Sequence, residues 1–197
     1  MKKGLLILLC LPMIVFGQGW ETCFLTPGFN TNANGVQQTT DGGYIIIGGI
    51  TDTTWQSQER DAYLIKTDGN GQEQWNHTFG GTGFEDGNSV QQTSDGGYII
   101  CTHGGSSVSP LSLIKTDGNG VEQWSQTFVV ITGFQPTVQQ TNDGGYIIVA
   151  GDRLLKTDGN GVEQWSQTFV GSGNSVQQTN DGGYIIAGRI YTNTSSS

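Results

Sequence analysis

Short apolar runs separated by glycine-rich turns recur along most of the chain. In the first clear example, Val36–Thr39 is half polar, Tyr44–Ile47 is continuously apolar, Ala62–Thr67 is mixed, and Gln74–Phe79 alternates between aromatic and polar side chains. A short continuous run is typical of a strand buried on both faces, and alternation is typical of a strand with one face in solvent. The pattern therefore predicts four strands. No segment after residue 17 carries apolar residues at helical spacing over ten residues, so a helical fold is not expected.

The turns between these strands have a sequence signature of their own. Asp-Gly-Gly joins the first pair of strands, and Asp-Gly-Asn-Gly joins the second pair. Glycine, Asn and Asp tolerate the positive φ that tight hairpin turns require. Each pair is therefore expected to form an antiparallel hairpin.

The four-strand pattern is repeated along the chain. Val-Gln-Gln-Thr occurs four times, each time followed by Asp-Gly-Gly-Tyr, and Lys-Thr-Asp-Gly-Asn-Gly occurs three times, each time followed by a Trp. The first motif starts at Val36, Val90, Val138 and Val176, and the second starts at Lys66, Lys115 and Lys156. Four antiparallel strands in a repeat of about 40–50 residues are typical of a β-propeller blade. We therefore predict an all-β fold, a β-propeller of four-stranded antiparallel blades.

The repeat motifs also resemble those of a known class of proteins. TDGGYIIIGG, LIKTDGNGQEQW and NHTFGG are similar to the repeats of secreted bacterial and archaeal β-propeller proteins, of the kind found among Bacteroidetes surface proteins. The resemblance extends over roughly residues 20–188. It implies an exported β-propeller and leaves the ligand open.

Counting the strands gives three complete blades and part of a fourth. The complete blades are expected at 36–79, 90–128 and 138–169, and the partial blade at 176–191. Residues 20–24 resemble the last strand of a split blade, because Trp20 precedes Val36 by nearly the same distance as Trp75 precedes Val90. Two arrangements fit: a truncated piece of a larger propeller, or a four-bladed ring closed by the N-terminal strand. We favour truncation, because the ring would lack one strand and would leave unpaired strand edges.

The N-terminus has the pattern of a secretory signal. Lys2 and Lys3 precede an apolar run over Leu5–Phe16, which is followed by Gly17 and Gln18. The run is too short to span a bilayer, and a small residue at its end suits cleavage. Residues 1–17 are therefore predicted to be a signal peptide cleaved near Gly17-Gln18, and 18–197 to be the repeat domain. The expected location is outside the cell or on the surface of a bacterium.

Composition narrows the classes of partner. The chain has 17 acidic and 8 basic residues and a formal net charge of −9, which disfavours binding to nucleic acids and to anionic membranes. Its 32 glycines fit the many turns. An exported chain is able to join Cys23 and Cys101 in a disulfide, but Cys101 lies within an apolar strand, where a buried thiol is the favoured interpretation.

The candidate binding residues lie on variable loops. Because neighbouring strands alternate in direction, all the glycine turns should lie on one face and the variable loops on the other, and binding residues prefer loops on a rigid scaffold. Trp55 stands out, since no other repeat has a Trp there, and an aromatic ring beside polar groups suits stacking on a sugar. The alternative is that Trp55 packs over the base of its loop. The candidate ligand-binding residues are Trp55, Gln58, Glu59, Arg60, Phe84, Glu85, Asp86 and Phe134.

Metal and catalytic signatures are weak. Asp68-Gly-Asn70-Gly71 resembles the start of a calcium loop, but the twelfth position is Phe79 where that loop has Glu, so turn chemistry is the favoured interpretation and no metal or cofactor is expected. The two histidines, His77 and His103, form no triad or metal-binding spacing. The lysines of the second motif are expected to pair with turn aspartates on a solvated surface.

The sequence therefore predicts a secreted, non-enzymatic binding or adhesion scaffold. Its partners would be glycans or surface proteins held by the variable loop face, and it would be a monomer or an open-ended piece of a larger propeller. One alternative is a secreted polysaccharide hydrolase or lyase that uses carboxylates such as Glu59 and Asp61, or Glu85 and Asp86. Another is a purely structural module of a larger surface protein.

Overall fold

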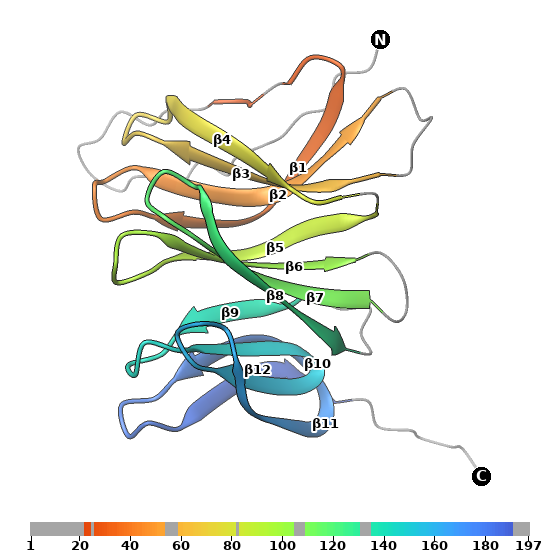
Figure 1. The fold of residues 1–197 in the computed structure, drawn as a ribbon, viewed down its shortest axis with the longest axis vertical. Helices are drawn as coiled ribbons and strands as arrows, with labels where there is room; N and C mark the ends of the chain where they lie inside the picture. Colours follow the sequence, from red (N-terminus) through yellow and green to blue (C-terminus); the bar gives the residue numbers. More distant parts are fainter. Residues whose placement is uncertain are drawn as a thin grey trace.

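The computed structural model of the chain is built from β-strands (Figure 1). It describes residues 22–24, 26–53, 59–81, 83–104, 109–130 and 135–190. Within these ranges twelve antiparallel strands form three four-stranded sheets and no helix is present, which confirms the predicted all-β class. The three sheets follow one another in chain order along the longest axis (Figure 1). The predicted signal peptide lies outside the described residues.

Each sheet is formed by four strands that are consecutive in the chain. The first sheet contains β1 (Phe29–Gln38), β2 (Tyr44–Asp52), β3 (Asp61–Thr67) and β4 (Glu73–Phe79), in that order. The second contains β5 (Glu85–Gln92), β6 (Tyr98–Gly104), β7 (Ser109–Thr116) and β8 (Glu122–Val130). The third contains β9 (Thr137–Gln140), β10 (Tyr146–Thr157), β11 (Glu163–Gln178) and β12 (Tyr184–Arg189), in the order β12-β11-β10-β9.

Two long strands of the third sheet each combine two strands of the repeat. A Cβ at Gly145 would lie 2.1 Å from the carbonyl oxygen of Thr157, so the two ends of β10 are adjacent and the strand folds back on itself. Gly151, with φ of 59°, lies in this bend. The part of β11 up to Thr168 pairs with β10, and the part after Gly171 pairs with β12, with one further pair between Gly173 and Gly151 of β10. The repeat therefore has four units: unit 1 (29–79), unit 2 (85–130), unit 3 (137–169) and unit 4 (172–189).

The glycine turns form the hairpins that their sequence predicts. In the Asp-Gly-Gly turns the first glycine has a positive φ in every unit, between 81° and 85°, a conformation that only glycine adopts without strain. The turn is closed by a backbone bond of 2.9 Å from Thr39 N–H to Gly43 C=O in unit 1, with equivalents in the other units. The turns after β1 and β5 lie on the same side of the molecule, at the left in Figure 1.

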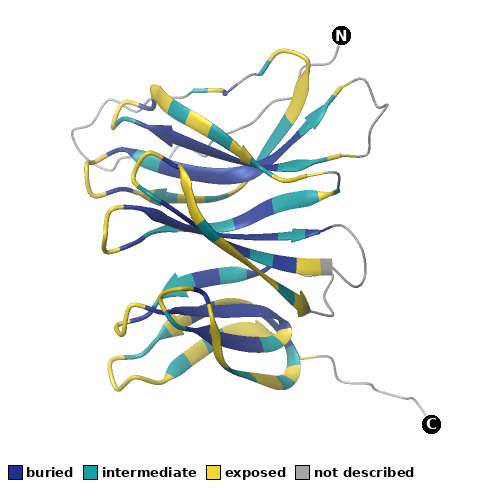
Figure 2. Ribbon diagram, viewed as in Figure 1, coloured by how far each residue is buried: buried dark blue, intermediate teal, exposed yellow. Residues whose placement is uncertain are grey.

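The apolar core lies between successive units. Ile45 and Ile47 of β2 pack against Val90 and Tyr98 of unit 2, whereas Ile46, between them in sequence, faces the opposite side. Side chains of a strand alternate between the two faces of its sheet, so a strand between two packed layers is apolar at every position. Figure 2 shows these inner strands as the buried part of the molecule. The continuous apolar run is thereby confirmed as a strand buried on both faces.

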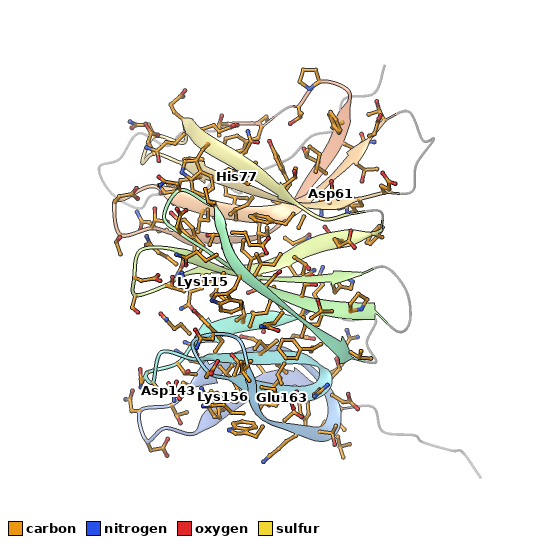
Figure 3. All side chains as sticks on the ribbon, in the orientation of Figure 1. Asp61, His77, Lys115, Asp143, Lys156 and Glu163 are labelled. Atoms are coloured by element: carbon orange, nitrogen blue, oxygen red, sulfur yellow. The ribbon has the colours of Figure 1, made fainter. Side chains whose placement is uncertain are left out.

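The lysines of the second motif differ from the prediction. Lys66 pairs with Asp41 at 2.8 Å, as expected, but its side chain is only 4% exposed, so the predicted solvated surface is wrong. Its Nζ also donates to the carbonyl oxygen of Thr67 at 2.7 Å and to Gln74 Oε1 at 3.2 Å. Room for it comes from Gly43, because a Cβ there would lie 2.6 Å from this Nζ. Lys115 with Asp95, and Lys156 with Asp143, repeat the arrangement (Figure 3).

Glutamines connect each unit to the next. Gln37 Oε1 accepts a hydrogen bond of 2.6 Å from the backbone N–H of Gln92, and Gln92 Oε1 in turn accepts one of 2.9 Å from the backbone N–H of Thr40. This reciprocal pair of bonds recurs between units 2 and 3 and between units 3 and 4. The Gln-Gln of the repeat motif is thus the polar contact that joins consecutive units, and it places unit 4 on unit 3 as unit 2 is placed on unit 1.

The described N-terminal residues depart from the expected strand. Thr22, Cys23 and Phe24 are not in a strand, and residues 20 and 21 lie outside the described part. Phe24 is nevertheless buried and packs on Ile46, among other residues of the outer face of unit 1. The segment therefore contributes an aromatic contact without the strand pairing that the spacing of its Trp suggested.

The two described cysteines are separate. Cys101 is fully buried in the core between units 2 and 3, as predicted for a small apolar side chain, and Cys23 is exposed; both are free thiols. Burial raises the pKa of the Cys101 thiol.

Over the described ranges the chain forms no helix that has the length and apolar character needed to cross a bilayer.

Candidate functional site

Three of the predicted binding residues meet in one cluster at the boundary of units 1 and 2. The Arg60 guanidinium lies 3.2 Å from Asp86 Oδ1 and 5.5 Å from the centre of the Phe84 ring, and it also donates to Asn32 Oδ1. Arg60 and Phe84 form a parallel backbone bridge. Glu85 N–H donates to the Arg60 carbonyl at 2.6 Å. These side chains are largely satisfied by one another, so the cluster joins two units as much as it offers contacts to a ligand.

The other predicted residues are placed differently. Trp55, Gln58 and Phe134 lie outside the described residues. Glu59 is exposed and lines a pocket on unit 1, described below. Glu85 is partly buried, and its Oε2 has no hydrogen-bond partner among the described residues. The structure therefore brings Arg60, Phe84 and Asp86 together, whereas Glu59 lines a different site.

A polar pocket of about 590 Å³ lies where all four units meet, and none of its lining residues is among the candidates predicted from the sequence. Its lining consists of Asn34, Asn88, Gln135, Pro136, Thr137, Asn174 and Arg189. Three of these are asparagines at the same place in the repeat, two residues before Val36, Val90 and Val176. That repetition was visible in the sequence, but only the packing of the units shows that the three asparagines line one pocket, which we call the axial pocket.

Asn88 holds the most constrained amide of the axial pocket. It is 6% exposed, and its Oδ1 accepts a hydrogen bond of 2.7 Å from His103 Nδ1. Desolvation lowers the pKa of His103, partly opposed by the charge of Asp86, so burial favours the neutral ring. Asn88 Nδ2 has no hydrogen-bond partner among the described residues. A buried amide donor without a partner costs about 1–3 kcal/mol, which makes it a natural contact for a ligand oxygen.

Neighbouring amides extend this network. Asn34 Nδ2 donates to the carbonyl oxygen of Gly87 at 2.8 Å, and Asn34 Oδ1 accepts from Asn32 at 2.9 Å. Asn32 is also the acceptor for Arg60. The axial pocket is thus connected through Asn32 to the cluster of Arg60, Phe84 and Asp86. Amide side chains carry both donors and acceptors without charge, a chemistry suited to hydroxyl groups.

A second pocket, of about 640 Å³, lies on unit 1 and has an acidic lining. Its carboxylates are Asp52, Glu59, Asp61 and Glu73. Asp61, labelled in Figure 3, has a buried Oδ1 without a hydrogen-bond partner among the described residues. Its pKa is raised by desolvation and, less strongly, by the charge of Glu59. Glu59 and Asp61 therefore share one pocket, as the enzymatic alternative requires, whereas Asp86 is paired with Arg60.

The Asp-Gly-Asn-Gly turns use their aspartates internally. Asp68 Oδ1 accepts backbone hydrogen bonds from Asn70 at 2.8 Å and from Gln72 at 2.9 Å. Asp117 and Asp158 make the same bonds. Turn chemistry thus accounts for these residues. In the part of the chain that the structure describes, no group of three or more His, Cys, Asp or Glu side chains is arranged to hold a metal ion.

Comparisons with known proteins point to the fold alone. No protein-family model and no curated protein matches this chain. Among solved structures, it is similar to a protein of unknown function from Bacteroides caccae, whose crystal structure was determined at 1.35 Å resolution. The two share 16% sequence identity with a TM-score of 0.61, and the match covers 85% of this chain and 56% of that one. This chain thus spans little more than half of its structural neighbour, and at this identity the similarity concerns the arrangement of strands.

Proposed function

We propose that the chain is a β-propeller repeat protein, with three complete blades and part of a fourth, that acts outside the cell as a non-enzymatic binding scaffold. Successive units with the same hairpins and the same glutamine contacts support the propeller arrangement. The predicted signal at 1–17 supports export. The ligand class that suits the site is a neutral glycan, bound at the variable loop face where the axial pocket lies.

The observation that carries this proposal is the buried Asn88 amide in a pocket lined by all four units. Sugar hydroxyls both donate and accept hydrogen bonds, and the pocket offers amides from Asn34, Asn88 and Asn174. Its volume of about 590 Å³ suits one or two sugar rings, within the size range of small-molecule sites. Hydrogen bonds hold the amides of Asn34 and Asn88 in place, so ordering these two side chains on binding should cost little free energy.

The proposal is tested by a glycan array followed by calorimetric titration of the best ligand. Asn88→Asp keeps the oxygen that bonds His103 but removes the free donor, so affinity should fall about tenfold or more, which corresponds to about 1.4 kcal/mol. Asn142→Asp makes the same change in an exposed turn and serves as the control. Trp55→Ala tests whether the loop residue contributes to the same site.

Two results would count against this function. One is the absence of binding to any neutral glycan on the array. The other is equal affinity of the Asn88→Asp and Asn142→Asp variants for the selected ligand, provided that both are folded by circular dichroism.

A second candidate is a polysaccharide hydrolase that uses Glu59 and Asp61. Glycosidases require one carboxylic acid that stays protonated near neutral pH beside one that is ionised. The raised pKa of Asp61 beside Glu59 in a pocket favours this pair over Glu85 and Asp86. Release of reducing ends from polysaccharides, abolished by Asp61→Asn, would establish this candidate, and no release by the wild type would exclude it for the polysaccharides assayed.

A further inference from the structure

Side chains that are buried at every internal unit boundary are exposed at the two ends of the molecule. We propose that these ends bind each other between two copies of the chain, head to tail. The N-terminal face is defined by Val36 and Gln38 of β1, and the C-terminal face by Gln177 of β11 and Ile185 of β12. This inference does not depend on the ligand of the axial pocket.

The N-terminal face lacks the neighbour that its equivalents have. Val36 is 58% exposed, whereas Val90, Val138 and Val176 are each 7–8% exposed. The difference arises because each of the other three valines packs on the preceding unit. A large exposed apolar side chain at a position that is otherwise a core position indicates an unoccupied unit boundary.

The C-terminal face shows the complementary pattern. Ile185 of unit 4 is 60% exposed, whereas its equivalents Ile45, Ile99 and Ile147 are fully buried against the following unit. The two exposed positions therefore belong to opposite sides of the same kind of boundary. Among the described residues, no unit packs on the first of these positions from before it, and none packs on the second from after it.

The glutamines repeat this complementarity. At each internal boundary the first Gln of one unit accepts from the backbone of the second Gln of the next, as Gln139 does from Gln178 at 2.7 Å. Gln177 and Gln38 are exposed and make no such contact with another described unit. Docking of the two faces would let Gln177 Oε1 accept from the Gln38 N–H, and Gln38 Oε1 accept from the Asn180 N–H. Both polar and apolar partners are thus already present.

Phe24 covers another part of unit 1 at the N-terminal end. It packs on Ile46 and Ile65, the equivalents of Ile100 and Ile114 in unit 2. Those two lie in the core cluster against which Phe79, from the last strand of unit 1, is packed. Phe24 therefore occupies the position in unit 1 that Phe79, from the last strand of unit 1, occupies in unit 2. Val36 and Gln38 of β1 remain exposed. At an internal boundary these positions contact the first two strands of the preceding unit, and unit 4 consists of two such strands.

A second copy of the chain is the partner that fits these two faces. The docked interface would continue a boundary that this chain already forms three times, with the same residue types on both sides. The two faces of one copy are unable to contact each other, because the first sheet and β12 lie at opposite ends of the longest axis (Figure 1). Such a head-to-tail interface is heterologous, and it produces a closed ring or an open chain of copies depending on its curvature.

The test is the mass of the purified protein in solution, measured by light scattering after size exclusion over a range of concentrations. The wild type should have the mass of two or more chains. Val36→Asp and Ile185→Asp should each give smaller particles, because each places a charge in the interface. Val121→Asp is the matched control, since Val121 is 55% exposed in a turn of unit 2, away from both ends.

Mixing the two variants distinguishes head-to-tail binding from other modes. Each variant retains one intact face, so an equal mixture of Val36→Asp and Ile185→Asp should recover particles of two chains, one of each kind. A monomeric wild type at high concentration would overturn the proposal. So would a mixture that stays monomeric while both variants are folded, or a Val121→Asp variant that dissociates as fully as the other two.

Discussion

The glutamine contacts between units allow a prediction with an internal control. Gln91 Oε1 accepts a hydrogen bond of 2.6 Å from the Gln140 N–H, whereas its equivalent in the last unit, Gln177, is exposed and accepts none from the described residues. Met has nearly the length and flexibility of Gln and is only a weak acceptor. Gln91→Met and Gln177→Met therefore make the same chemical change with and without a hydrogen bond to lose.

The expected loss follows from the state of the orphaned donor. The Gln140 N–H lies at a position of intermediate exposure, so water compensates only in part. A donor left unsatisfied in the interior costs about 1–3 kcal/mol, and partial access of water places Gln91→Met in the lower half of that range. Gln177→Met should stay within about 0.5 kcal/mol of the wild type, as an exposed substitution does. Gln91→Glu keeps an acceptor oxygen and should lose less than Gln91→Met.

Two measurements check this prediction. Urea unfolding gives the change in the midpoint, with both substitutions made in the Ile185→Asp background so that association between copies does not contribute. Amide hydrogen exchange then reports the Gln140 N–H itself, which should exchange faster in Gln91→Met. Equal unfolding midpoints for the two Met variants, together with unchanged exchange at Gln140, would refute the role assigned to the Gln-Gln motif.

Three further predictions concern individual residues. Desolvation raises the pKa of Asp95, but hydrogen bonds from Lys115 and Thr93 outweigh it and lower the pKa to about 2. Because an unfolded Asp titrates near 3.9, the free energy of unfolding that this carboxylate contributes above about pH 4 should be lost as the pH falls towards 2. The urea midpoint of Asp95→Asn should therefore depend less on pH across that window. Gly97→Ala should lower the free energy of unfolding by about 1–3 kcal/mol, because the added Cβ would lie 2.1 Å from the Thr116 carbonyl oxygen. Gly183→Ala should cost less in the same urea unfolding experiment, because the nearest neighbour of its Cβ would be a hydroxyl at 3.0 Å. Leu113→Ala should cost about 2–5 kcal/mol by urea unfolding, because Leu113 is fully buried between units 2 and 3; a loss below 1 kcal/mol would contradict the assigned core.

The buried lysines suggest why the Asp-Gly-Gly-Tyr and Lys-Thr-Asp motifs occur together. Each lysine fixes two hairpins of its unit to each other, since Lys115 contacts Asp95 of one turn and the Thr116 carbonyl oxygen beside the next. The second glycine of the first turn makes the space for the ammonium group. The Asp95 side chain is 58% exposed, so the carboxylate of this ion pair remains in contact with water while the ammonium group is buried.

Most strands, their hairpins and the alternation of buried faces follow from the sequence alone, because they depend on contacts within a few residues. The strand expected over 20–24 is the exception, since Thr22, Cys23 and Phe24 are not in a strand. The run Tyr44–Ile47 and the positive-φ glycine Gly42 specify a buried strand and its turn without any knowledge of the rest of the chain. The sequence also placed Arg60, Phe84 and Asp86 among the candidates, since they lie in variable loops that flank regular strands.

Which repeated residues meet depends on how the units pack. Asn34, Asn88 and Asn174 are ordinary polar residues in the sequence, and they become lining residues of one pocket because the units pack with a constant register. Contacts between the hairpins of unit 1 bury Lys66, which was expected on a solvated surface, and Val36 and Ile185 are exposed although their equivalents in the other units are buried. A repeat unit buries its faces only against its neighbours, so the environment of a side chain depends on whether a neighbouring unit is present as well as on its own local sequence.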